Sequence, residues 1–113
     1  MKEILEKALI KKIERLEAFE DRLSVRFDTI SIKVDEDDGW FTVFCEVHST
    51  NGTTIEHTIE IECVLYDQEG LILGKESRAI YPEDFFGFEV IDIPFQEDGI
   101  ADKVGKIRMY PKK

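Results

Sequence analysis

From residue 25 onward, apolar side chains fall on every second position in short runs that end in turn residues, and this pattern constrains the fold more than any other feature. In residues 40–48, for example, Phe41, Val43 and Cys45 occupy alternate positions. Such alternation is typical of β-strands that bury one face and expose the other. The expected strands are residues 25–34, 40–48, 55–66, 71–73, 76–81, 85–93 and 104–110.

Turn signals separate these runs at short intervals, among them the acidic stretch 35–39, the Asn51-Gly52 pair and residues 67–70. Asn-Gly is a strong signal for a tight turn between strands. No helical pattern lies between the strands, whereas a parallel sheet needs crossover helices. The sequence therefore predicts a mainly β fold, an antiparallel β-sandwich of about seven strands.

The N-terminal region has a different period. Its apolar residues recur at spacings of three and four without Gly or Pro, which predicts an amphipathic α-helix over residues 3–22. The apolar stripe consists of Leu5, Leu9, Ile13, Leu16, Phe19 and Leu23. Such a helix is marginal alone in water, so its apolar face must be covered. We expect two units, the helix in residues 1–23 and the sandwich in residues 24–113. The helix covers its own sandwich or forms the interface with an unidentified protein partner or a homodimer.

Two cysteines, Cys45 and Cys63, lie in apolar, β-branched runs, which predicts buried free thiols in a reducing compartment. If residues 41–48 paired directly with residues 55–66, Cys45 would face Ile59. The ladder would then hold the two cysteines too far apart for a disulfide. If the two strands lay in opposite sheets, this reasoning would not apply.

The composition describes one globular domain. The 113 residues are 42% hydrophobic and 35% charged, with a net charge of −10, and this hydrophobic content excludes a disordered acidic tail. No stretch approaches the roughly 20 apolar residues of a membrane-spanning helix. An acidic chain is poorly suited to contact phosphates, so we expect neither a nucleic-acid nor a membrane partner. Residues 1–7 lack the apolar core of a secretory signal, so we expect a cytoplasmic location.

The charge is unevenly distributed. Residues 1–22 are balanced, residues 23–102 hold four basic and nineteen acidic side chains for a net charge of −15, and residues 103–113 hold five basic and no acidic side chains. This field would attract a partner with a basic surface. Alternatively, the charge serves solubility, and Lys106 and Arg108 protect an edge strand from aggregation.

The stretch Cys63-Val64-Leu65-Tyr66-Asp67, followed by Gln68-Glu69-Gly70, resembles the signature of the FxLYD-type bacterial domains, with Cys63 at the position of the Phe. The Asn-Gly turn before it and the stretches 80–82 and 85–88 after it are similar to the family's layout. The resemblance covers about residues 25–110. It implies an immunoglobulin-like sandwich whose biochemical role is generally unassigned.

The same motif has a physical interpretation of its own. Leu65 continues the core face, and Tyr66 points outward with a ring that can cover a neighbouring strand. Asp67 can accept hydrogen bonds from backbone N–H groups in the turn, and Gly70 can supply the left-handed residue. These roles serve the fold.

Few residues suggest chemistry. His48 and His57 are expected on opposite faces, His48 at the surface near a turn and His57 at the edge of the core. Carboxylates suit calcium, so Asp35, Asp37 and Asp38 are weak metal candidates, although the EF-hand spacing is missing. The sequence contains no Cys-x2-Cys pair, hydrolase serine motif or phosphate-binding loop. We therefore expect neither an enzyme nor a cofactor.

Aromatic residues suggest an interaction surface. Phe85 and Phe86 cannot both point inward from one straight strand, so they form an exposed patch with Phe88 and Trp40, or one of them packs under the N-terminal helix. The candidate interaction residues are Leu5, Leu9, Leu16, Phe19, Phe85, Lys106 and Arg108. We expect a non-catalytic protein-interaction or assembly module, for which strand addition at a sheet edge is one binding mode. The alternative is an accessory domain that binds calcium or another ligand through acidic loops.

Overall fold

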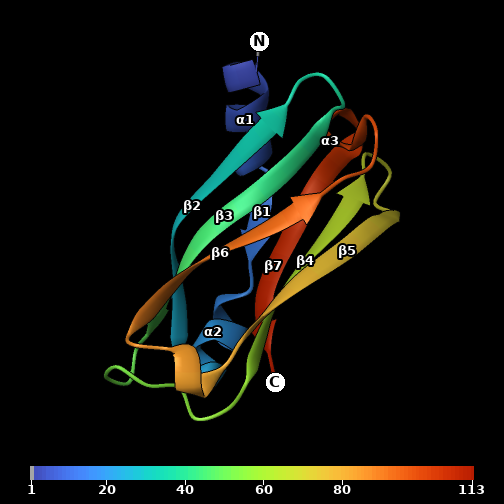
Figure 1. The fold of residues 1–113 in the computed structure, drawn as a ribbon. Coiled ribbons are helices and arrows are strands. Elements are labelled where there is room, and N and C mark those ends of the chain that lie inside the picture. Colours follow the sequence, from blue (N-terminus) through green and yellow to red (C-terminus); the bar gives the residue numbers. More distant parts are fainter. Residues whose placement is uncertain (1) are drawn as a thin grey trace.

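Two β-sheets pack face to face in the computed structural model, which describes residues 2–113 (Figure 1). The four-stranded sheet has the order β1 (Ile13–Arg15), β7 (Val104–Lys112), β4 (Ile59–Asp67) and β5 (Ile72–Ile80). The three-stranded sheet has the order β2 (Val25–Asp35), β3 (Trp40–Ser49) and β6 (Phe88–Phe95). The short helices are α1 (Lys2–Ile10), α2 (Glu17–Leu23), α3 (Ile100–Lys103) and the 3-10 turn η1 (Pro82–Asp84).

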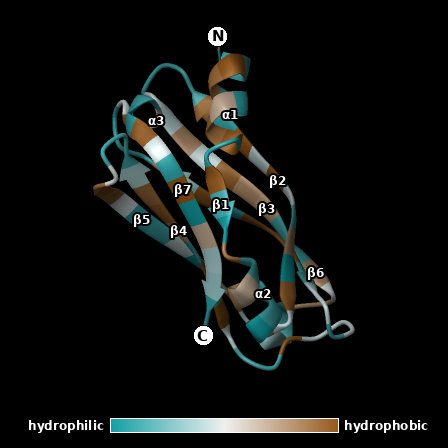
Figure 2. Cartoon of the chain, turned by 180° about the vertical axis from the view of Figure 1, so that it is seen from behind, coloured by the Kyte–Doolittle hydropathy of each residue, from teal (hydrophilic) through white to brown (hydrophobic). Residues whose placement is uncertain are grey.

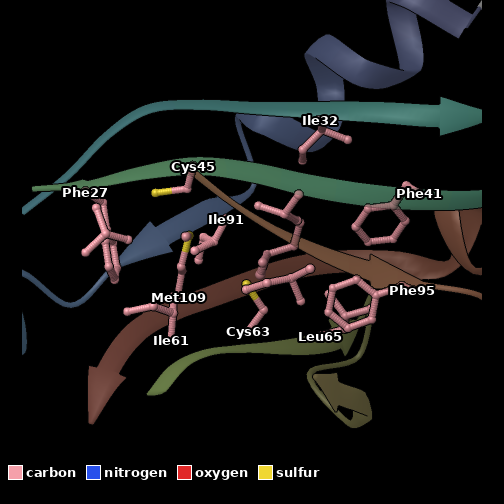
Figure 3. Close-up of a cluster of buried hydrophobic side chains, with 14 of the residues drawn as sticks. Phe27, Ile32, Phe41, Cys45, Ile61, Cys63, Leu65, Ile91, Phe95 and Met109 are labelled. Atoms are coloured by element: carbon pink, nitrogen blue, oxygen red, sulfur yellow. The ribbon is translucent and has the colours of Figure 1, made fainter. Parts of the chain in front are cut away.

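The core lies between the two sheets because each strand turns alternate residues inward. Figure 3 shows Phe27, Cys45 and Phe41 of the three-stranded sheet facing Ile61 and Leu65 of the other sheet. All five side chains are almost fully buried. The predicted fold class, a mainly β sandwich of seven strands with an N-terminal helix, is confirmed.

Most strands lie near their predicted positions, with two differences. Residues 71–73 and 76–81 form one strand, β5, instead of two, and its register shifts near Gly74. The seventh strand comes instead from the N-terminal segment, where β1 pairs in parallel with β7. The rest of the paired strands are antiparallel, as predicted.

The prediction of one continuous helix over residues 3–22 is wrong. The chain leaves the helix after Ile10, forms β1 and then begins α2 at Glu17. The cause is non-local: the Ile107 amide donates to the Lys12 carbonyl at 3.0 Å, and the Leu16 amide donates to the Met109 carbonyl at 3.3 Å. Pairing with the open side of β7 thus outweighs local helix propensity. Residues 2–23 are consequently part of the sandwich.

Of the two arrangements left open for residues 41–48 and 55–66, the structure has the second, with the two strands in opposite sheets. β3 pairs with β2 and β6, while β4 pairs with β5 and β7, so the chain crosses between sheets after β3. Cys45 and Cys63 therefore lie in facing sheets as buried free thiols. Burial raises the pKa of each thiol to about 12, so both behave as small apolar groups at neutral pH.

The prediction that Lys106 and Arg108 protect an edge strand is wrong as well. Their strand, β7, lies between β1 and β4 and is therefore internal. β1, which the sequence did not predict as a strand, occupies the edge of the sheet next to β7. The edges of the sandwich are β1 and β5 in one sheet and β2 and β6 in the other.

Candidate interaction surface

The N-terminal segment closes one side of the sandwich. Figure 2, seen from behind, shows α1, β1 and α2 following one another between β7 and β2. Two carboxylates from this segment accept hydrogen bonds from the edge strand β2. Glu6 Oε2 accepts from the Val34 amide at 2.7 Å, and Glu20 Oε1 accepts from the Phe27 amide at 3.0 Å. The edge of β2 is thereby capped at two points.

The Glu20 carboxylate is itself fixed by an ion pair. It is almost fully buried, and Arg15 donates to its two oxygens at 2.6 and 3.1 Å. Burial of a carboxylate is costly unless its charge and lone pairs are satisfied. Here one guanidinium and the Phe27 amide satisfy them, so β1, α2 and β2 are connected through a single side chain.

The apolar residues predicted for an interface mostly face the sandwich of the same chain. Leu9 has 0% exposure and belongs to the core, Leu5 packs against the core, and Leu16 is half-buried. Phe85 is also buried. Phe19 remains at the surface with 38% exposure, and its ring meets Tyr110 edge-on at 5.6 Å. Within this structure, the N-terminal helices therefore pack in cis.

The two predicted basic residues, Lys106 and Arg108, lie on the outer face of β7, and both approach the ring of Tyr66. Lys106 Nζ is 4.8 Å and Arg108 Cζ is 5.4 Å from the centre of the Tyr66 ring. Arg108 also pairs with Glu14 of β1 at 2.7 Å. The outward orientation predicted for Tyr66 is confirmed, and these cations hold neighbouring strands together.

The turn after Tyr66 also has the predicted geometry. Asp67 Oδ1 accepts hydrogen bonds from the amides of Glu69 and Leu71, both at 2.9 Å. Gly70 has a φ of 86°, a backbone conformation that residues other than glycine rarely adopt. The motif therefore serves the β4–β5 turn.

A buried carboxylate, Glu62, joins three strands on the outer face of the four-stranded sheet. It accepts a hydrogen bond from Tyr110 at 2.9 Å and pairs with Lys112 at 2.8 Å and Lys75 at 3.7 Å. Burial alone would raise the pKa of Glu62, but hydrogen bonds from Lys112 and Tyr110 and the charges of both lysines lower it below the ordinary value. This cluster fastens β5 and β7 to β4.

The other edge of that sheet, β5, carries charged side chains. Lys75, Glu76 and Arg78 are all exposed along it, and charges on an edge strand discourage pairing with another chain. Arg78 also reaches β6, where it donates to the Asp92 carbonyl at 3.0 Å and pairs with the Asp92 carboxylate at 3.1 Å. The C-terminal half of β6 is thereby tied to β5.

The N-terminal half of β6 and the bend before it remain exposed and apolar. Phe86, Phe88 and Val90 are 84%, 52% and 59% exposed. Phe88 and Val90 project from the outer face of the sheet, opposite to the buried Ile91. The His48 ring stacks on Phe88 at 5.1 Å. We call Phe86, Phe88 and Val90 the β6 patch.

The edge of β6 beside this patch has no strand partner within residues 2–113. Because the Asp92 carbonyl accepts from Arg78, it points away from β3. Backbone groups alternate along an antiparallel strand, so the amides and carbonyls of Phe88 and Val90 face the same open side. Pro94, two residues after Asp92, faces the same open side but has no N–H group to donate.

The acidic turn and the histidines give no metal site. Among residues 2–113, no three His, Cys, Asp or Glu side chains form a group that could hold a metal ion. Asp35 Oδ1 accepts from the Asp37 amide at 3.0 Å and so shapes the turn, while partial desolvation and the charges of Asp35 and Asp98 raise the pKa of Asp38. His57 lies exposed in a loop, so the prediction that it sits at the core edge is wrong.

No family model matches the sequence, and no curated protein matches it. Two solved structures are similar in shape. The crystal structure of Campylobacter jejuni cj0090 has a TM-score of 0.48 at 10% identity, covering 89% of this chain and 96% of that chain. The solution structure of the uncharacterized lipoprotein yajI from Escherichia coli has a TM-score of 0.41 at 15% identity, covering 74% of this chain and 55% of that chain. The FxLYD resemblance stays a prediction.

None of the helices in the part of the chain that the structure describes has the length and apolar character to cross a membrane.

The sequence indicated part of the β6 patch and missed the rest. Phe85 and Phe86 do point to opposite sides, the first buried and the second exposed. Trp40 lies apart from the patch, half-buried, and its Nε1 donates to Asp98 at 2.9 Å. Val90 was missed, although its place two residues after Phe88 puts both on one face of a strand.

Proposed function

We propose that this chain is a non-catalytic protein-interaction module whose contact surface is the β6 patch. The observation that carries the proposal is the exposure of three large apolar side chains, Phe86, Phe88 and Val90, within five residues of the chain. Large apolar side chains grouped on the surface of a soluble protein mark interaction sites. Aromatic side chains also contribute a large share of the energy at protein interfaces.

The remaining surface supports this choice of site. The apolar face of α1 packs against the core of its own chain, where Leu9 is fully buried. Leu71 and Ile72 are also exposed, but they lie where β5 begins, next to the β4–β5 turn and ahead of the charged stretch from Lys75 to Arg78. They therefore offer a matched control surface for experiments on the β6 patch.

Site-specific photo-crosslinking in an extract of the cells that express the chain tests the proposal. A benzoylphenylalanine at position 86 is expected to give a discrete adduct with another protein, and the same group at position 71 is not. Adding Phe88→Ser and Val90→Ser to the position-86 protein should abolish the adduct. Equal labelling from positions 86 and 71, or an adduct that survives both substitutions, would contradict the proposal.

A further inference from the structure

We infer that the partner is an extended segment of another protein that adds to the open edge of β6 as an extra strand, with apolar and basic residues in alternation. The inference rests on the proposed function and specifies the binding mode and the chemistry of the partner. Three observations carry it: the contrast between β6 and the other edges, the direction of its unpaired backbone groups, and the charge around it.

The other sheet edges are protected by recognisable means. The β2 edge donates to carboxylates from Glu6 and Glu20. The β5 edge is charged, and β1 is only three residues long. Capping, charge and shortness are common defences against pairing with another chain. Among residues 2–113 no side chain caps the N-terminal half of β6; its outward side chains, Phe88 and Val90, are apolar, and its one charged side chain, Glu89, lies on the opposite face.

The backbone of this half-strand is oriented to receive a partner. The Asp92 carbonyl points away from β3, and backbone groups alternate in direction along the strand. The amides and carbonyls of Phe88 and Val90 therefore also point away from β3. A guest strand would form ladder hydrogen bonds there, and side chains on one of its faces would lie beside the rings and methyl groups of the β6 patch. Arg78 and Pro94 limit the guest to the N-terminal part of the edge.

The charge around the β6 edge indicates which side chains the added strand carries on the face opposite to the β6 patch. Glu89 alternates with Phe88 and Val90, so it points to the opposite side of the strand. Glu83 and Asp84 of η1 are exposed just before it, within a body whose net charge over residues 23–102 is −15. Lys or Arg at alternate guest positions would complement this side. A second copy of the chain would bring acidic side chains against acidic side chains.

An NMR titration with the blocked peptide Lys-Val-Lys-Val-Lys-Val-Lys tests the inference on the full chain. Shifts are expected at the Phe88 and Val90 amides, and the peptide with glutamate in place of lysine should bind at least tenfold more weakly. Two further peptides are methylated on the backbone nitrogens, one at every valine and the other at every lysine. Because only one set of amides faces β6 in a paired strand, one methylated peptide should lose binding at least tenfold and the other should retain it.

Val90→Pro provides the matched change on the protein. It removes the Val90 N–H from the open edge while leaving the ladder to β3, and proline is tolerated on edge strands. Peptide affinity should fall at least tenfold, whereas Ile72→Ser on β5 should leave it unchanged. The methylated peptides test the same contact independently of whether this variant folds.

Several results would overturn the inference. They are the absence of peptide binding, equal binding of the two methylated peptides, and shifts centred away from β6. Self-adducts of the purified chain through position 86 would show instead that a second copy occupies the edge. If the crosslink to another protein at position 86 stands while the peptides fail, the interaction surface is right and the strand-addition mode is wrong.

Discussion

Leu9 anchors α1 to the sandwich, so Leu9→Ala is expected to destabilise the whole fold. The side chain has 0% exposure and belongs to the core. Replacing a buried leucine by alanine removes three carbons and leaves a cavity that the surroundings fill only in part, at a cost of about 2–5 kcal/mol. Because α1 is a short helix outside both sheets and can shift toward the space, we expect about 2–4 kcal/mol. Leucine and alanine have similar helix propensities, so propensity contributes little.

The assay is urea unfolding of the full chain, followed by fluorescence and circular dichroism. In a parallel thermal melt, a loss of about 3 kcal/mol should lower the melting temperature of a domain of this size by roughly 12 °C. The control is Ile4→Ala on the same helix, because Ile4 is 65% exposed and its loss should cost less than about 0.5 kcal/mol. If Leu9→Ala proved as mild as Ile4→Ala, α1 would not be packed in cis and the reasoning would fail.

Three further predictions concern stability. Glu62→Gln should lower the free energy of unfolding by about 1–3 kcal/mol at pH 7. The pKa of Glu62 is lowered in the folded state. The stabilisation by its carboxylate is therefore complete above the unfolded pKa of about 4.3 and is lost as the pH falls through the folded pKa. Urea unfolding across pH measures this, and a loss independent of pH would refute it. Gly105→Ala should cost about 1–3 kcal/mol by thermal unfolding, because its Cβ would lie 2.6 Å from the Asp67 carbonyl oxygen. Gly74→Ala, with open space around the new Cβ, is its control, and equal effects would count against the close approach. Glu20→Gln should speed hydrogen exchange at the Phe27 amide by tenfold or more, since the amide loses a charged acceptor; unchanged exchange would contradict this contact.

The strands could be predicted because each one buries a single face, so that apolar residues recur at every second position of the local sequence. Their pairing could not be predicted in the same way. Residues 50–58 between β3 and β4 suit a hairpin and a crossing between sheets equally well, and only the competition among all strands decides. β1 was missed for a similar reason. Ile13 fits both a helical stripe and an edge strand, and the unpaired side of β7 settles the choice.

The candidate site was partly visible in the sequence. Adjacent phenylalanines at 85 and 86 required one exposed ring, and the structure places Phe86 outside. The protection of the other edges was not visible, because Glu6 and Glu20 look like ordinary surface residues of a helix. Their role as acceptors for β2 amides depends on contacts between residues seven and 28 positions apart.

The N-terminal segment closes the β2 edge of the sandwich, whereas the first half of the β6 edge stays open. Residue-resolved amide hydrogen exchange of the full chain tests this most directly, since exchange reports which amides lack a partner. We predict slow exchange at the Phe27 and Val34 amides, which donate to carboxylates, and fast exchange at Phe88 and Val90. Exchange at Phe88 and Val90 as slow as that at Phe27 would contradict an open β6 edge.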